Sequence, residues 1–251
     1  MKASKPLTAF IFFLLLQHVS WSFTFNTNTW MDFSGKVNNK TVYLSLFQTN
    51  EGVLYGSYSD CDRKNKVLLT GEISGNQVHL IGLLKGKEVE EFNLKNISDS
   101  TDRLQGSRVI KSTKQKSLVS FRLEAMCGGT LEHRYGDYFG VDDDVEQFMA
   151  DIQTAVRTND KVWMSKNVQY PIVVLVGQKK KLTIKNEAAF IQQYDKIFSV
   201  AFKNKIVASC TCNLFNNNSG VMLGDGEIWI YQKENSTEKD YDFIISAINN
   251  Y

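Results

Sequence analysis

The candidate for acid–base chemistry in this chain is a carboxylate on a predicted helix near residue 190. Asp195 follows Tyr194, and the other face of the helix is apolar. In a pocket, Asp195 would act as a general base and Tyr194 as a hydrogen-bond donor. No histidine follows His133, so the usual near-neutral base is missing from this half of the chain. We favour the simpler interpretation, in which Asp195 points to solvent or pairs with Lys196 or Lys203.

A second acidic pair, Asp225 and Glu227, stands between glycines. Side chains at positions i and i+2 of a strand point to the same face, so a paired acid site would be possible here. A Gly-Asp-Gly turn that enters a strand explains the same residues without chemistry. We favour the turn.

The sequence contains no Gly-x-Ser-x-Gly motif, phosphate-binding loop or dinucleotide fingerprint. Cys127 and His133 could form a thiol–imidazole pair, but in an oxidising compartment we expect a disulfide instead. We therefore assign no catalytic residue beyond the candidate Asp195 with Tyr194, and we expect no cofactor.

The four cysteines are Cys61, Cys127, Cys210 and Cys212. In an exported chain they are candidates for two disulfides, and three pairings are possible. If each half of the chain closes its own bond, the pairs are Cys61–Cys127 and Cys210–Cys212, although a ring closed across one residue is strained. Zinc would need two more ligands close to the Cys-x-Cys pair. We therefore predict no metal.

Residues 1–22 have the layout of a secretory signal peptide. Lys2 and Lys5 precede an apolar run at residues 7–16, and small residues follow at alternating positions. The run is about half the length of the roughly 20 residues that a membrane span needs. We expect cleavage near Phe23, a periplasmic or secreted protein, and no membrane span afterwards.

Composition and net charge argue against a nucleic-acid partner. The chain has 251 residues, of which 43% are hydrophobic and 22% charged, which is typical of a globular protein with one or two domains. Without the two lysines of the predicted signal peptide, 27 basic residues face 27 acidic ones. A neutral chain lacks the positive field that nucleic-acid binding usually needs, so we expect no nucleic-acid partner.

Short apolar runs alternate with turn residues through residues 23–130. Runs at 42–46, 53–58, 78–83 and 118–123 alternate with period two, and no helical window interrupts them. About seven or eight such strands predict an all-β antiparallel barrel or sandwich. The Gly-x-Tyr, Leu-x-Gly-x-Ile and Leu-x-Gly runs in this region resemble a small β-barrel module of bacterial secreted and periplasmic proteins.

The pattern changes after a predicted linker at residues 131–141. The aspartates at 142–144 open an amphipathic helix, and a strand pair, a second helix and further strands follow to residue 251. This order predicts an α+β domain at 142–251. The Tyr170-Pro171 step and the stretches at 190–198 and 220–229 resemble the NTF2-like cone fold, in which a curved sheet wraps around helices.

The cone resemblance implies a pocket whose aromatic lining would be Trp163, Tyr170, Tyr194 and Trp229. That fold hosts both enzymes and plain binding modules, so it does not choose a function.

Small size, export, disulfides and missing catalytic motifs favour a non-enzymatic, two-domain binding protein of the bacterial periplasm or exterior. Its partner would be a protein or a small ligand of the cell envelope, and one version is an inhibitor or immunity-type partner of an envelope enzyme. The alternative is a cone-fold isomerase, dehydratase or hydrolase that uses Asp195. A structural module tethered to an envelope complex is a third possibility.

Overall fold

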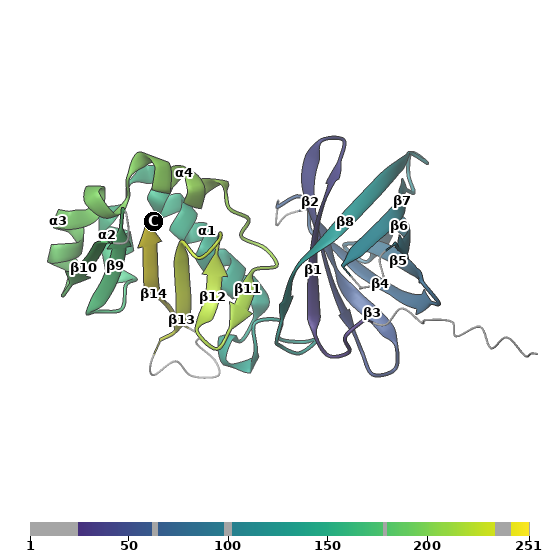
Figure 1. Ribbon diagram of the computed structural model, residues 1–251, viewed down its shortest axis with the longest axis horizontal. Coiled ribbons are helices and arrows are strands. Elements are labelled where there is room, and N and C mark those ends of the chain that lie inside the picture. Colours follow the sequence, from purple (N-terminus) through teal and green to yellow (C-terminus); the bar gives the residue numbers. More distant parts are fainter. Residues whose placement is uncertain (1–24, 62–64, 98–101, 178–179, 234–241, 251) are drawn as a thin grey trace, which may run out of the picture.

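The computed structural model describes residues 25–61, 65–97, 102–177, 180–233 and 242–250. The predicted signal peptide, residues 1–22, lies outside these ranges. The described chain forms two parts that lie side by side, a barrel and a sheet with helices (Figure 1).

The barrel closes because β1 pairs with both β2 and β8. Each of its eight strands runs antiparallel to its neighbours, which confirms the predicted all-β antiparallel barrel. The strands are β1 (Trp30–Val37), β2 (Lys40–Gln48), β3 (Val53–Ser59), β4 (Val67–Ser74), β5 (Gln77–Leu84), β6 (Lys87–Asn96), β7 (Arg103–Ile110) and β8 (Lys116–Cys127).

Alternation of apolar and polar residues gives the barrel its core. In β5, Val78 and Leu80 are buried, whereas His79 between them is only half-buried. Successive side chains of a strand point to opposite faces, so one face of every strand fills the interior, where Phe33 and Phe92 lie. Closure also leaves no free strand edge.

The second part is a six-stranded sheet with four helices, in the order β10-β9-β14-β13-β12-β11. It is mixed because β14 pairs parallel with β9 while its other pairs are antiparallel, and this confirms the predicted α+β class. The elements are α1 (Asp142–Thr158), α2 (Lys161–Lys166), β9 (Ile172–Val176), β10 (Lys180–Ile184), α3 (Glu187–Ile197), α4 (Val200–Ala208), β11 (Phe215–Asn217), β12 (Gly220–Leu223), β13 (Ile228–Gln232) and β14 (Phe243–Asn250).

Side-chain caps begin three of the helices. Asp160, Asn186 and Ser199 each accept a hydrogen bond from a backbone N–H in the first turn of α2, α3 and α4. Helix α1 begins with three aspartates in its first turn, as predicted, and their charge complements the helix dipole. Its N-cap, Val141, offers no side-chain acceptor.

Helix α1 runs behind the sheet in the view of Figure 1. Val145, Met149 and Ile152 on its inner face are fully buried and belong to the same core as Val221 and Ile230 of the sheet. The three- and four-residue spacing of the apolar residues in α1 therefore marks the face that packs on the strands.

Residues 131–141, the predicted linker, connect the two parts, and some of their side chains are packed against them. Arg134, Tyr135 and Phe139 are buried, and Asp137–Phe139 form a short 3-10 helix, η2. Glycines and turn residues indicate an irregular backbone, but they do not reveal whether the side chains between them are buried. This segment therefore helps to fix the two parts against each other.

A search of the described helices for membrane spans finds none that is long and apolar enough.

Candidate functional site

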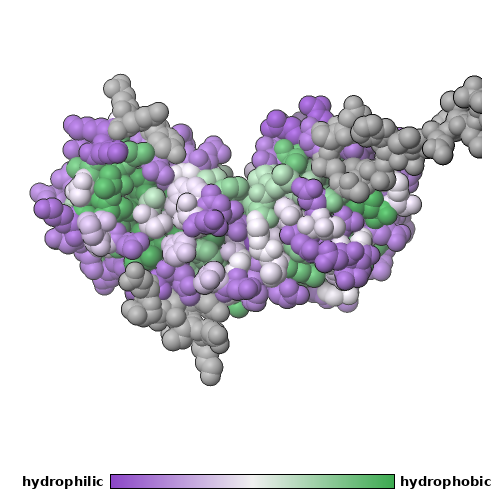
Figure 2. Space-filling model, turned by 60° about the horizontal axis from the view of Figure 1, so that its bottom comes forward, coloured by the Kyte–Doolittle hydropathy of each residue, from purple (hydrophilic) through white to green (hydrophobic). Residues whose placement is uncertain are grey.

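A cavity of about 730 Å³ lies where the barrel meets the second part. One wall comes from β1, β2 and β8, and the other comes from the end of α4, the loop that follows it, and the turn between β12 and β13. Figure 2 shows a notch in the outline between the two parts. A cavity of this size is large enough for a small organic ligand.

Asp32 lies in the barrel wall and is held by a buried arginine. Arg134 Nη2 pairs with the Asp32 carboxylate at 2.5 Å, and Arg134 Nη1 donates to Ser45 Oγ at 2.6 Å. Burial lowers the pKa of Arg134, but the negative charge of Asp32 outweighs this effect, and the pKa rises above its ordinary value. The guanidinium also lies 5.0 Å from the ring centroid of Trp30. The Asp32 carboxylate is therefore held in place by an ion pair and a hydrogen bond within the protein.

Glu227 forms the opposite wall, under a glycine turn. Its Oε2 accepts a hydrogen bond from the backbone N–H of Asp225 at 2.6 Å, and its Oε1 lies 3.8 Å from Lys205 Nζ. Gly224 has a φ of +68°, and a Cβ at this position would collide with the Glu227 carboxylate. The acidic pair Asp225 and Glu227 thus lies in a turn, as the simpler interpretation predicted, but both residues also line the cavity.

Tyr43 lines the cavity and interacts electrostatically with groups from both of its walls. Burial raises the pKa of this phenol, and electrostatic interactions with Cys212, Glu124 and Asp225 raise it further. Glu124 in turn accepts a hydrogen bond from Ser34 Oγ at 2.6 Å. These groups come from both parts of the chain and line the same cavity.

Acidic side chains outnumber basic ones among the lining residues, and Arg134, Arg122 and Lys205 pair with three of the four carboxylates. Carboxylates of Asp32, Glu124, Asp225 and Glu227 line the cavity, and Lys205 is the lysine among the lining residues. Its apolar surface includes Phe215 and Met222. The cavity therefore suits a molecule with a positively charged group and an apolar body.

The aromatic residues predicted to line a cone pocket do not line this cavity. Trp163, Tyr170 and Tyr194 pack against the core between helices and sheet. Trp229 pairs across strands with Met222 and makes an edge contact with Phe215. Apolar periodicity identifies a buried face, but it does not distinguish a packed core from an open pocket.

Asp195 and Tyr194 lie in different surroundings. The Asp195 side chain is 75% exposed and accepts a hydrogen bond from Lys161 Nζ at 2.7 Å, which lowers the pKa of the carboxyl. Tyr194 points into the core, where burial raises its pKa to about 12. Asp195 therefore faces solvent, as the favoured interpretation held, with Lys161 as its partner in place of Lys196 or Lys203.

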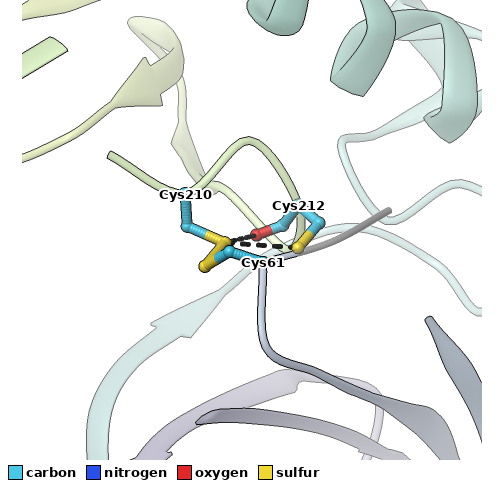
Figure 3. Close-up of side chains that lie close together, drawn as sticks. All are labelled: Cys61, Cys210 and Cys212. Carbon is cyan, nitrogen blue, oxygen red and sulfur yellow. Dashed lines mark hydrogen bonds between the residues drawn. A yellow bond between two sulfur atoms is a disulfide. The ribbon is translucent and has the colours of Figure 1, made fainter. Parts of the chain in front are cut away.

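The predicted disulfide pairing is wrong, because Cys61 is bonded to Cys210 across the two parts (Figure 3). The Cα atoms are 5.2 Å apart, while Cys127 and Cys212 remain thiols. The prediction assumed that each half closes its own bond. Packing of the halves instead brings the chain after β3 next to the loop after α4.

Cys212 completes a cluster of three sulfur atoms. Its Sγ lies 3.2 Å from Cys210 Sγ, and the Sγ atoms of Cys61, Cys210 and Cys212 all lie within 4.8 Å of one another. Three thiolates at this spacing are ligands that Zn²⁺ or Cu⁺ would accept. The Cys61–Cys210 bond, however, uses two of the three sulfurs, so the oxidised protein offers one thiol here.

Cys127 and His133 each have a partner other than one another. His133 Nδ1 lies 2.8 Å from Gly140 O, and Cys127 Sγ lies 3.4 Å from Asp32 Oδ2. Burial raises the pKa of Cys127 to about 11. Because the thiolate is the reactive form, Cys127 is a poor nucleophile at neutral pH.

The sequence reasoning missed Arg134 and Glu146, two buried charged residues at the junction. Glu146 Oε1 accepts hydrogen bonds from Lys66 Nζ and Tyr135 Oη, both at 3.0 Å, and from the backbone N–H of Asn213 at 2.9 Å. An acid beside Val145 on the apolar face of a helix was a detectable signal. Arg134 belongs to a charged stretch of the kind that is usually exposed, and nothing in the sequence indicates that it is buried.

A scan against protein-family models found no match for this chain, and a search of curated proteins found no significant match either.

Proposed function

We propose that this protein binds a small, positively charged organic ligand in the cavity between the barrel and the second part, without turning it over. The lining carries this proposal, because it holds four carboxylates and one lysine, and the carboxylate of Asp225 has no ion pair among the residues that the structure describes. A cleft lined mainly by one sign of charge concentrates ligands of the opposite sign. Phe215 and Met222 would contact the apolar part of the ligand.

The partners of the buried carboxylates support binding rather than turnover. Asp32 is held by Arg134 and Ser45, and Glu227 is held by the backbone of Asp225. A general base has to accept a proton from its substrate, whereas these oxygens already accept hydrogen bonds within the protein. Asp225 lines the same cavity without an ion pair to any described residue, so its carboxylate would contact the cation.

For the compartment we propose export to the bacterial periplasm or exterior. The Cys61–Cys210 disulfide supports this proposal, because such bonds persist in oxidising compartments, and so does the layout of residues 1–22. The expected result of cell fractionation is a product outside the cytoplasm with an N-terminus near Phe23. A cytoplasmic product that retains residues 1–22 would contradict export.

For the second part we propose a cone-like, NTF2-like arrangement. A six-stranded mixed sheet with helices packed on it supports this proposal. The proposed ligand site lies outside such a cone, against the barrel. The inhibitor or immunity-type role and the enzyme that uses Asp195 stay predictions that no contact in the structure favours.

Ligand binding is tested with defined probes, measured by thermal shift and calorimetry. Spermidine, choline and glucosamine are the cations, glucose is the neutral probe, and citrate is the anion. We expect at least one cation to bind and citrate to fail. Glu124→Gln and Asp225→Asn should each weaken cation binding by about tenfold, because each removes a charge-assisted contact.

Asp195→Asn is the matched control, since Asp195 is an exposed carboxylate that does not line the cavity. It should leave cation binding unchanged. Equal binding of citrate and cations, or equal weakening by the control, would overturn the proposal.

A further inference from the structure

The three-sulfur cluster at the junction contains a thiol and a disulfide at reacting distance. Cys212 Sγ lies 3.2 Å from Cys210 Sγ, which is bonded to Cys61 Sγ. Figure 3 shows the Cys212 sulfur on one side of the Cys210 sulfur and the Cys61 sulfur on the other. Separations of about 3–3.5 Å between reacting atoms are typical of near-attack geometry.

We propose that this cluster is a thiol–disulfide exchange site in which Cys212 is the nucleophile. Cys212 gives up its proton, and its thiolate attacks Cys210 Sγ. The Cys210–Cys212 bond forms as the Cys61–Cys210 bond breaks, and Cys61 leaves as a thiolate that takes up a proton. One disulfide and one thiol are present before and after the step, so no external oxidant or reductant is needed.

Ser59 contacts both Cys212, the attacking residue, and Cys61, the leaving residue. Ser59 Oγ accepts a hydrogen bond from the backbone N–H of Cys61 at 3.0 Å and lies 3.5 Å from Cys212 Sγ. Cys61 has a φ of +71°, in the left-handed region that is unfavourable for a side chain with a Cβ. The Cys61–Cys210 bond is thus made by a residue in an unfavourable backbone conformation.

The exchange changes which segments of the chain the disulfide links. The Cys61–Cys210 bond ties the end of β3 to the loop after α4, whereas a Cys210–Cys212 bond is confined to that loop. Both cysteines of the loop line the cavity between the two parts. The site therefore converts a covalent tie across the cavity into a local ring in one wall. This inference does not depend on the proposed ligand.

The experiment traps the released thiol. The purified protein is held with excess iodoacetamide, quenched at intervals and digested with trypsin without reduction. Cleavage leaves Cys210 and Cys212 on one peptide, residues 206–233, and Cys61 on another, residues 41–63. Mass spectrometry then separates the cross-linked pair from peptide 206–233 with an internal disulfide.

In the wild type we expect alkylated Cys61 and internally bonded peptide 206–233 to accumulate together. In Cys212→Ser the release of Cys61 should be slower by about tenfold or more, because the serine hydroxyl does not attack a disulfide. Cys127→Ser is the control and should behave as the wild type, since Cys127 lies outside the cluster.

Two outcomes would overturn the proposal. One is a wild type in which Cys61 stays linked to peptide 206–233 throughout. The other is release of Cys61 from Cys212→Ser at the wild-type rate. The internal disulfide of the wild-type peptide requires Cys212, so the result does not depend on the folding of any variant.

Discussion

At the scale of single residues, the ion pair between the buried Arg134 and Asp32 is the first contact that holds the junction. Arg134 is 2% exposed and its guanidinium is bound by Asp32, Ser45 and the carbonyl oxygen of Leu214. An arginine cannot shed its charge on burial. It therefore needs a carboxylate close by, and Asp32 supplies it.

Asp32→Asn should destabilise the fold by about 3–5 kcal/mol, because it leaves the buried guanidinium without a counter-charge. The measurement is urea unfolding at neutral pH. Asp195→Asn is the control, and it should change stability little because its ion pair is exposed. Equal effects of the two substitutions would contradict the buried-pair account.

The buried thiol of Cys127 should make the stability of the protein fall at alkaline pH. Its pKa is raised from 9.0 to about 11 by burial first and then by the charge of Asp32. A raised pKa in the folded state means that the native protein holds this proton longer than the unfolded chain does. The resulting stability is complete below about pH 9 and is lost as the pH rises through about 11.

This loss should amount to about 2–3 kcal/mol, at 1.36 kcal/mol per pKa unit. Cys127→Ser has no titrating thiol here, so its unfolding free energy should fall less than that of the wild type over the same alkaline range. Urea titrations at a series of pH values measure both slopes. Identical slopes would show that Cys127 does not carry the effect.

At the scale of elements, helix α1 begins without a side-chain cap. Val141 occupies its N-cap in an extended conformation and is 55% exposed. Val141→Ser should stabilise the protein by about 1 kcal/mol, because the hydroxyl can accept a hydrogen bond from a free N–H of the first turn. Val200→Ser is the control, since the adjacent Ser199 already caps α4, and thermal unfolding compares the two. A gain from both variants, or from neither, would contradict the capping explanation.

Most elements were predictable because their patterns are local. The alternation in β5 and the three- and four-residue spacing of α1 depend on neighbours within the same element. The Cys61–Cys210 bond and the burial of Arg134 depend on how two parts pack, which no local period encodes. For the same reason Trp163 and Tyr194 were predicted to line a pocket, whereas the structure packs both into or against the core.

At the scale of the whole molecule, three kinds of contact join the barrel to the second part. The Cys61–Cys210 disulfide links positions separated by 149 residues. Arg134 reaches from the segment after the barrel to Asp32 of β1, and Glu146 of α1 pairs with Lys66 near the start of β4. A small apolar cluster of Trp30, Phe47 and Cys127, with Phe215 packed against it, closes the same boundary.

The disulfide should contribute to the free energy of unfolding, and the buried charges should keep the unfolding of the two parts coupled. Cys61→Ser should lower the unfolding free energy by about 3–5 kcal/mol, because the unfolded chain regains the freedom of a long closed loop. The transition should stay single, since the ion pairs still couple the two parts. Far-ultraviolet circular dichroism and tryptophan fluorescence, recorded together during urea unfolding, test both points. Two separated transitions would mean that the disulfide alone holds the parts together, and the buried charges would then lose the coupling role assigned to them.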